Sequence, residues 1–315
     1  MSEERFLVLV TDKVSASGLE PFDEDDRFDI IQVNDSSTPE FTEALGRAHG
    51  LVVRSATKVR DELLAKAPNL KVIGRAGVGV DNIDLEAASA RGVAVMNAPA
   101  GNTVSAAELT MALMMSMVRQ VAAADASVRK GEWKRSRFKG VELRGRTLGL
   151  VGAGRIGGTV AKRCQAFGMR VLAYDPYLTD ERAADLGVAR AELDDVIESA
   201  DVLSLHVPLT DDTRNLIDAD ALRRMKKGAY LVNVARGGVV DEEALARALA
   251  SGRLAGAAVD VFEAEPLDAD SPLRNAPNLF LTPHLGASTA EAQELVAGEI
   301  AEAVRLALAE GDLSR

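Results

Sequence analysis

Three polar side chains that together could move a proton and hold a carboxylate lie in the second half of this 315-residue chain. Arg236, Glu265 and His284 each follow a short apolar run typical of a β-strand. Because the carboxyl ends of parallel strands meet at one edge of a sheet, we expect the three side chains to converge there. A cation, an acid and a histidine in one crevice indicate acid–base chemistry on a small acid.

His284 and Glu265 are the pair expected to handle the proton. His284 can take a proton from a hydroxyl group, or return it, near neutral pH. Glu265, bonded to the other ring nitrogen, would orient the imidazole and stabilise its charged form. Arg236 would grip a carboxylate as a permanently charged fork. No metal site is expected. His49 is expected at the surface, and His206 either lines a cofactor cleft or is a hydrogen-bonded strand-end residue.

A glycine-rich turn predicts a dinucleotide site upstream of these side chains. The apolar run 147–151 leads into Gly152-x-Gly154-x-x-Gly157 and a helical stretch from Arg155 to Phe167. Gly152 permits the tight turn, Gly154 lets backbone approach a pyrophosphate, and Gly157 lets the helix pack closely on its strand. The N–H groups that open the helix would face the anion.

Asp175 indicates that the dinucleotide is NAD. It ends the next apolar run, roughly 20 residues after the glycine turn, where an acid binds the adenosine ribose. Its charge would repel the 2′-phosphate of NADP, and the three residues after it carry no cation. Asp260 and the Ala235 carbonyl, beside the predicted catalytic groups, are expected to bind the nicotinamide carboxamide.

Length and composition favour a two-domain protein that acts on small molecules. The chain is 47% hydrophobic with a formal charge of −11, enough for a large core but longer than one ordinary domain. The acidic balance disfavours nucleic acid and anionic membranes as partners, since both reward clustered Lys and Arg. Cys164 is the single cysteine, expected to be a small buried side chain. Without a disulfide, signal peptide or membrane span, we expect a cytoplasmic protein.

Strand-like and helical patterns alternate in two blocks, which predicts two domains with parallel sheets. Residues 99–103 break the first block, and Ser105-x-x-Glu108 resembles a capping box that opens a long Ala/Met-rich helix. A final helix, from about Thr289 to Glu310, has no new sheet to join and is expected to return to the first domain. The expected strands are 6–11, 29–33, 50–54, 72–75, 93–97, 147–151, 169–174, 202–206, 229–234, 257–261 and 279–282.

Motifs spread over nearly the whole chain resemble those of the D-isomer-specific 2-hydroxyacid dehydrogenases. The family's arginine, glutamate and histidine fall on Arg236, Glu265 and His284. The motifs are Gly74-Arg75-Ala76-Gly77-Val78-Gly79-Val80-Asp81-Asn82-Ile83-Asp84, Asn97-Ala98-Pro99 with Asn102-Thr103, the glycine turn with Asp175, Asn233-Val234-Ala235-Arg236-Gly237-Gly238, Asp260-Val261-Phe262 through Glu265-Pro266, and Thr282-Pro283-His284-Leu285-Gly286-Ala287-Ser288-Thr289.

The resemblance implies a fold, an assembly and further contacts. The fold is α/β, with a doubly wound Rossmann domain for NAD (99–287) inserted into a doubly wound, flavodoxin-like substrate domain (1–98 and 288–315). A homodimer is expected, with a tetramer left open; the Met-rich helix around 111–117 would form the interface or, alternatively, pack in the core. Implied substrate contacts are Arg54, Ser55, Arg75, Gly77, Val78 and Asn102; further cofactor contacts are expected at Val78, Arg155, Ile156, His206, Val207, Val234 and Gly286.

The activity implied by the resemblance is NAD-dependent oxidation of a small 2-hydroxyacid. The leading substrate is 3-phospho-D-glycerate, oxidised to 3-phosphooxypyruvate at the start of L-serine synthesis, with Arg54 and Arg75 holding its charged groups. Glyoxylate or hydroxypyruvate reduction and D-lactate oxidation are the enzymatic alternatives. An NAD-responsive binding protein, like the corepressors of this architecture, is the non-enzymatic one. If Arg315 is the natural end, regulation through the C-terminal extension that many members carry is not expected.

Overall fold

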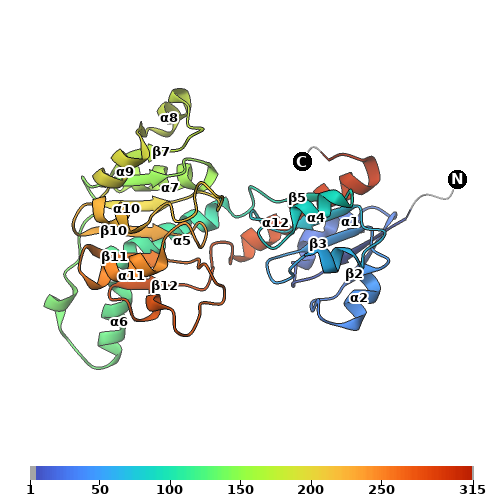
Figure 1. Cartoon of the computed structure of the whole chain (residues 1–315), viewed down its shortest axis with the longest axis horizontal. Helices are drawn as coiled ribbons and strands as arrows, with labels where there is room; N and C mark the ends of the chain where they lie inside the picture. The colour runs from blue at the N-terminus through green and yellow to red at the C-terminus, as the bar shows by residue number, and fades with distance from the viewer. Residues whose placement is uncertain (1–4, 314–315) are drawn as a thin grey trace. The chain divides into compact units, whose positions relative to one another are not determined.

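The chain folds into two compact units, each with its own parallel sheet (Figure 1). The computed structural model describes residues 5–313, so the outermost parts of the predicted first domain, 1–4 and 314–315, lie outside the described residues. Unit 1 contains the described residues up to Asn102 and those from Ala287 on, and unit 2 is Thr103–Gly286. An inserted second unit is therefore present.

Unit 1 is built on five strands in the order β2-β1-β3-β4-β5, the order of flavodoxin-like folds. Along β1, which lies inside the sheet between β2 and β3, Val8 and Val10 pack on one face and Leu9 on the other. Both faces are thus covered, which is why these strands are nearly continuous apolar runs. The elements are β1 (Phe6–Val10), η1 (Ala16–Leu19), α1 (Glu20–Asp23), β2 (Phe28–Gln32), α2 (Pro39–Leu45), β3 (Gly50–Val53), α3 (Asp61–Leu64), β4 (Val72–Arg75), α4 (Leu85–Ala90), β5 (Ala94–Asn97) and α12 (Ala290–Glu310).

The helix α12 returns the end of the chain to this sheet, as predicted. Thr289 caps it by accepting the N–H of Ala292 at 3.1 Å. The helix packs on β3, β4 and β5, where Gly74 allows a close approach: a Cβ at that position would lie 2.6 Å from Val304 and 2.8 Å from Ile300. The final helix therefore completes the core of unit 1.

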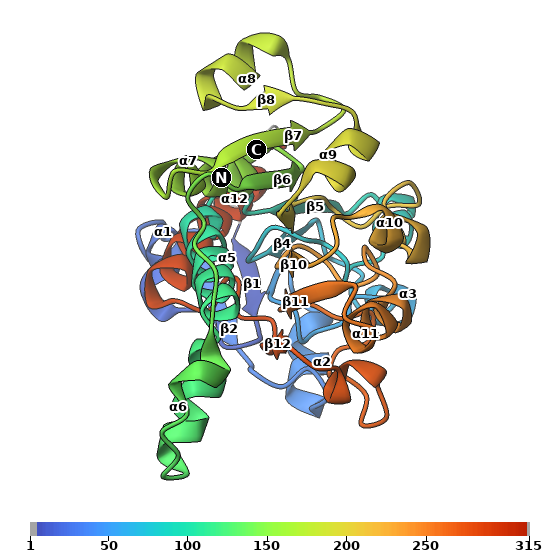
Figure 2. The same ribbon diagram turned by 90° about the vertical axis from the view of Figure 1, so that its left-hand side faces the viewer.

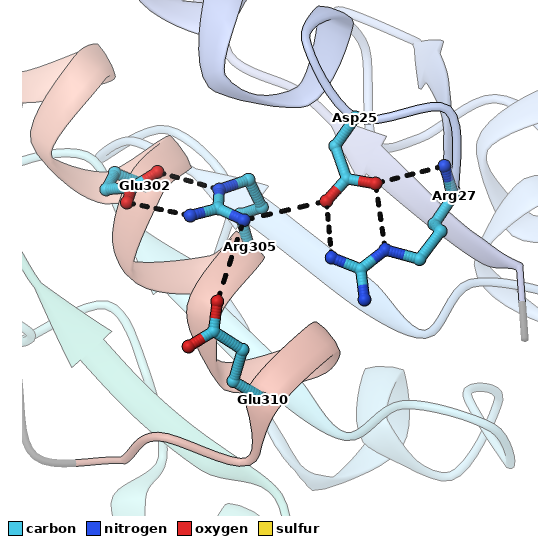
Figure 3. Close-up of polar contacts among 5 residues, drawn as sticks. All are labelled: Asp25, Arg27, Glu302, Arg305 and Glu310. Atoms are coloured by element: carbon cyan, nitrogen blue, oxygen red, sulfur yellow. Dashed lines mark hydrogen bonds and ion pairs between the residues drawn. The ribbon is translucent and has the colours of Figure 1, made fainter.

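Ion pairs join α12 to the turn between α1 and β2 (Figure 3). Arg305 donates to both carboxylate oxygens of Glu302, at 2.8 and 2.9 Å. The same guanidinium lies 3.5 Å from Asp25 and 3.9 Å from Glu310. Hydrogen bonds from Arg27, aided by the charges of Arg27 and Arg305, lower the pKa of the Asp25 carboxyl to about 2. This charge cluster holds α12 against the turn between α1 and β2.

Unit 2 has seven parallel strands in the order β12-β11-β10-β9-β6-β7-β8, which extends the Rossmann order. The strand order reverses between β6 and β9, where such sheets bind ligands. The elements are α5 (Thr103–Val118), α6 (Val121–Arg129), η2 (Arg135–Phe138), β6 (Thr147–Val151), α7 (Arg155–Ala166), β7 (Arg170–Tyr174), α8 (Asp180–Leu186), β8 (Ala189–Arg190), α9 (Leu193–Ser199), β9 (Val202–Leu205), α10 (Ala219–Arg224), β10 (Ala229–Asn233), α11 (Glu242–Ala250), β11 (Leu254–Val259), η3 (Pro272–Asn275) and β12 (Leu279–Leu281).

The Met-rich helix α5 lies against β10, β11, β12 and α7. Met111, Met114 and Met117 are buried in the core of unit 2, so these three side chains pack within the unit. Cys164 of α7 is also fully buried, as predicted, with its Sγ 3.6 Å from the sulfur of Met111. Burial raises the pKa of the Cys164 thiol to about 12. The helix α6 instead projects from the rest of the unit (Figures 1 and 2).

Two details near the start of α5 differ from the prediction. The helix begins at Thr103, so Ser105 lies within its first turn, and the capping box predicted there is wrong. The Ser105 hydroxyl instead donates to the carbonyl of Gly286 at 2.9 Å. The units also divide after Asn102 and Gly286 rather than after residues 98 and 287. Gly101 explains the first shift, since a Cβ there would lie 2.5 Å from Val296 of α12.

Within residues 5–313, none of the helices combines the length and apolar character needed to cross a membrane.

Candidate active site

The glycine turn follows β6, and each of its three glycines has a separate structural reason. Gly152 has φ of +93°, and a Cβ there would lie 2.5 Å from the carbonyl oxygen of His206. A Cβ at Gly157 would collide with the carbonyl of Gly152, so its absence lets α7 pack against the turn. A Cβ at Gly154 would meet no heavy atom of the described residues within 4 Å. The turn therefore leaves open space above the N-terminus of α7.

Asp175 lies at the end of β7 beside this turn. One carboxylate oxygen accepts the N–H of Ala153 at 2.8 Å, and the other accepts the N–H of Tyr177 at 2.8 Å. Each oxygen keeps a further lone pair, so the carboxylate can still accept hydroxyl groups. The two backbone contacts hold the Asp175 side chain beside the glycine turn, and its contact with a ribose stays a prediction.

His206 and Val207 form the wall of the turn at the end of β9. The Cγ1 of Val207 would lie 3.1 Å from a Cβ at Gly152. The Nε2 of His206 lies 2.9 Å from the hydroxyl of Ser204, and burial lowers the pKa of the imidazole to about 4. The ring is therefore neutral at physiological pH. It is a hydrogen-bonded strand-end residue beside the glycine turn; that it lines a cofactor cleft stays a prediction.

These residues fit a dinucleotide. The open space at Gly154 lies where α7 begins at Arg155, and helix N-terminal N–H groups favour a phosphate there. Arg155 and Ile156 belong to this first turn. The acid of Asp175 follows on the neighbouring strand. The arrangement can hold a pyrophosphate at the helix and a ribose at the acid.

His284 and Glu265 form a direct pair, as predicted. The Nδ1 of His284 lies 2.8 Å from one carboxylate oxygen of Glu265. The other oxygen of Glu265 accepts the N–H of Phe262 at 3.1 Å, which fixes the carboxylate. The side chains of His284 and Glu265 are 44% and 38% exposed, so a small molecule can reach the ring. With Nδ1 engaged, Nε2 is the nitrogen that can exchange a proton with a ligand.

Asp260 shapes the loop that carries His284. It is fully buried, and its carboxylate accepts the Thr282 hydroxyl at 2.5 Å and the N–H groups of Leu285 and Gly286 at 2.8 and 3.0 Å. Its backbone carbonyl accepts the N–H of His284 at 2.8 Å. Burial raises the pKa of the Asp260 carboxyl. The predicted contact with a nicotinamide carboxamide stays a prediction; the observed contacts hold the loop.

Arg236 follows β10 in the same unit. Its guanidinium donates to the Ala235 carbonyl at 2.7 Å, which therefore already has one partner. The side chain of Asn233 braces the turn by donating to the Arg236 carbonyl at 3.0 Å and accepting the Ala235 N–H at 3.1 Å. A Cβ at Gly237 would collide with the carbonyl of Phe262. That glycine lets the Arg236 turn approach the segment that leads to Glu265.

The predicted substrate contacts lie in unit 1. The Arg75 guanidinium lies directly against Gly77, where a Cβ would collide with it. The same guanidinium donates to the Ala76 carbonyl at 3.3 Å. The Val78 carbonyl accepts from the side chain of Asn97 at 2.6 Å. Arg54 and Gly77 line one pocket, and the sequence did not suggest its other residues, which are Val14, Ser15, Ala76, Ala287, Ala292, Gln293 and Val296. Ser55 is exposed and Asn102 half-buried.

The described residues contain no group of three or more His, Cys, Asp or Glu side chains that could hold a metal ion. The candidate catalytic side chains of unit 2 are His284, Glu265 and Arg236, and the glycine turn is its candidate cofactor site.

Comparisons with known proteins agree with this arrangement. A family model described as D-isomer specific 2-hydroxyacid dehydrogenase, NAD binding domain, matches residues 111–286. The D-3-phosphoglycerate dehydrogenase of Bacillus subtilis (strain 168) is 49% identical over 299 residues, which cover 95% of this chain and 56% of that protein. The chain thus spans about half the length of the curated relatives it matches.

Two solved structures are similar along the whole chain. The TT0316 protein from Thermus thermophilus is 38% identical with a TM-score of 0.85, covering 97% of both chains. The D-lactate dehydrogenase from Aquifex aeolicus, complexed with NAD and lactic acid, is 34% identical with a TM-score of 0.84, covering 97% of this chain and 96% of that one.

Proposed function

The chain belongs to the D-isomer-specific 2-hydroxyacid dehydrogenase family, whose NAD-binding domain it contains, and we propose that it oxidises 3-phospho-D-glycerate to 3-phosphooxypyruvate. The observation that carries the reaction type is the 2.8 Å contact between His284 Nδ1 and Glu265. It leaves the other ring nitrogen to act on a substrate hydroxyl. The choice of substrate is supported by curated D-3-phosphoglycerate dehydrogenases that are 49 and 50% identical to this chain.

His284 and Glu265 carry the proton in this proposal. Nε2 of His284 takes the hydroxyl proton, and the carboxylate of Glu265 at Nδ1 stabilises the charged ring that results. Such assistance contributes about 10² to 10⁴ in rate. Arg236 binds the substrate carboxylate with its planar fork. When bound, NAD supplies the nicotinamide carbon that accepts the hydride.

We propose that Arg54 and Arg75 of unit 1 bind the remaining charge of the substrate, with further contacts from Ser55, Gly77, Val78 and Asn102. The guanidinium group suits both carboxylate and phosphate because it can donate two parallel hydrogen bonds. The pocket that Arg54 and Gly77 share supports this role, since it is lined by Ser15 and Gln293 as further polar groups.

The substrate assignment is tested by comparing kcat/KM for 3-phospho-D-glycerate, D-glycerate and D-lactate with NAD, and for glyoxylate and hydroxypyruvate with NADH. A preference for the phosphorylated acid is expected. D-Lactate is the second candidate, because the neighbour that holds NAD and lactic acid matches along the whole chain. A preference for an unphosphorylated acid would remove the phosphoglycerate assignment. Absence of turnover with every acid would favour the NAD-responsive binding protein.

We infer that the protein acts in the cytoplasm as a homodimer joined through α6 and the loop after it. The apolar side chains of Val121, Val128 and Trp133 are 52, 54 and 79% exposed, on a segment that projects from its unit (Figure 2). A projecting apolar surface of this kind is normally covered by protein. Sedimentation of the purified chain should give twice the monomer mass, and the double variant Val128→Glu, Trp133→Glu should sediment as a monomer.

A further inference from the structure

The loop that carries Arg54 is held by a carboxylate from a different strand. Asp12, just after β1, accepts the N–H of Arg54 and the N–H of Thr57 on one oxygen, both at 2.9 Å. Its other oxygen accepts the hydroxyl of Thr57 at 2.6 Å. Asp12 and Lys13 both have positive φ, at +63° and +53°. This uncommon pair of left-handed residues turns the chain at the end of β1, where the carboxylate meets the loop.

The same loop is held from its other side by an amide. Asn82 is 4% exposed, and its Nδ2 donates to the carbonyls of Arg54 and Thr57, both at 2.8 Å. The backbone of Asn82 continues the attachment, because its carbonyl accepts the N–H of Val59 at 2.8 Å. Asn82 thus closes the loop 54–57 with two bonds from one amide group.

Asp12 and Asn82 together bind both backbone groups of the same residue. The N–H of Arg54 is bonded to Asp12 and its carbonyl to Asn82. The backbone groups of Thr57 have the same two partners. Because peptide planes are rigid, fixing the N–H and the carbonyl fixes the direction in which the Arg54 side chain leaves the chain.

We propose that Asp12 and Asn82 are positioning residues that set where the Arg54 guanidinium meets an anionic group of the substrate. The inference rests on the proposed function, in which Arg54 binds substrate charge. It deepens that function by assigning the placement of the Arg54 guanidinium to two residues whose side chains bind the backbone of its loop. A small displacement of such a contact can cost about 10²-fold in activity.

The test compares three loop variants with two matched controls. Asn82→Asp keeps the size of the side chain but places an oxygen against two carbonyls. Asp12→Asn removes the charge that accepts two N–H groups. Thr57→Val removes only the hydroxyl bonded to Asp12 and is the mildest change, in case the others fail to fold.

The control variants make the same chemical changes elsewhere in unit 1. Asn69→Asp alters an amide that donates to the Gly46 carbonyl at 3.1 Å. Asp35→Asn alters a carboxylate that accepts the N–H and hydroxyl of Ser37 at 2.9 and 2.6 Å. Neither side chain contacts the loop 54–57, so the controls report the general cost of such changes.

The loop variants should raise KM for 3-phospho-D-glycerate about tenfold or more, with kcat and the Kd of NAD within about twofold, because Arg54 binds substrate before and during reaction. The controls should leave all three values within about twofold of the unmodified chain. In an Arg54→Met background, adding Asn82→Asp should raise KM no further, since a residue that acts through Arg54 has no effect once that side chain is gone.

Two outcomes separate this inference from the proposed function. If the unmodified chain oxidises the substrate but Asn82→Asp and Asp12→Asn leave KM unchanged, or raise it equally with and without Arg54, the positioning role is wrong and the function stands. If the unmodified chain turns over none of the acids, the proposed function fails and the inference fails with it. The unfolding midpoint of every variant shows whether a rise in KM comes from misfolding.

Discussion

At the scale of single residues, the proposed active site depends on how the backbone and ring of His284 are held. His284 has a left-handed backbone with φ of +55°, uncommon for a residue other than glycine. The carboxylate of Asp260 holds the loop on both sides of it, through Thr282 before it and Leu285 after it. Glu265 then fixes the ring at Nδ1. His284, the proton carrier of the proposed reaction, is therefore held by its backbone and by its side chain.

Removing the charge of Glu265 should slow catalysis while cofactor binding survives. Glu265→Gln keeps the shape of the side chain but no longer favours the protonated ring of His284. We expect kcat to fall about 10²-fold, with the Kd of NAD unchanged. Steady-state kinetics and calorimetry measure the two quantities. Glu263→Gln, an exposed acid in the same loop, is the matched control. Equal kcat in Glu265→Gln and the control would remove the assigned role of Glu265.

Removing Asp175 should weaken the preference for NAD over NADP. The carboxylate accepts the N–H groups of Ala153 and Tyr177, and in the proposed NAD site its charge would repel the 2′-phosphate of NADP. In Asp175→Ala the kcat/KM ratio of NADP to NAD should rise about tenfold or more, the effect of roughly 1.4 kcal/mol. Asp185→Ala removes an exposed acid from the nearby helix α8 as a control. An unchanged cofactor ratio would place the selectivity elsewhere.

At the scale of elements, short loops at the ends of strands position the candidate side chains. The sequence predicted which loops these are and the contact between Glu265 and His284, but not the other hydrogen bonds that hold the loops. The glycine turn, Asp175, and the pair Glu265 and His284 follow from spacing and residue type, because parallel strands end at one edge. Ser105 shows the limit: its pattern fits a capping box, yet its hydroxyl bonds Gly286, more than 180 residues away in sequence. Contacts of that range leave no local signal.

The cluster around Asp25 should make the stability of unit 1 depend on pH in the acid range. The folded pKa of about 2 lies below the ordinary value of 3.8, so the ionised carboxylate stabilises the fold above about pH 4. This stabilisation is lost as pH falls through about 2. Asp25→Asn should therefore lower the free energy of unfolding by about 1 kcal/mol near neutral pH and by little near pH 2.

Urea unfolding at several pH values measures this difference. The control is Asp26→Asn, an exposed neighbour, which should change the free energy of unfolding by less than about 0.5 kcal/mol at every pH. If Asp25→Asn lowered the free energy of unfolding as much near pH 2 as near neutral pH, the ion pairs with Arg27 and Arg305 would not be the source of the loss.

At the scale of the whole molecule, the order of strands and helices was sufficient to predict two parallel sheets, with one unit inserted in the other. The sequence could not show which side chains contact distant strands within each unit. His49, predicted at the surface, is half-buried: its Nδ1 accepts the N–H of Leu7 at 3.0 Å, and its ring meets Phe6 edge-on. A residue that ends a loop gives no local sign of the strand it will contact.

The hydrogen bonds that join Asp12 and Asn82 to the backbone of Arg54 could not be predicted from the sequence, because they also connect residues far apart along the chain. Asp12 and Arg54 are 42 residues apart, and their contact depends on β1 and β3 being neighbours in the sheet. The family resemblance implied a substrate contact for Arg54, and one family motif contains Asn82, but neither indicated that Asp12 and Asn82 hold Arg54. The spacing of residues thus identifies which side chains could be catalytic, whereas tertiary contacts determine how accurately those side chains are placed.

The central claim is that the whole chain is a dehydrogenase whose proton carrier is His284. The most direct measurement follows NADH formation from 3-phospho-D-glycerate by the unmodified chain and by His284→Ala, with the Kd of NAD determined for both. The account predicts turnover by the unmodified chain, a fall in kcat/KM of about 10² to 10⁴ in the variant, and equal binding of NAD. Retained kcat/KM in His284→Ala, or no NADH from the unmodified chain, would contradict it.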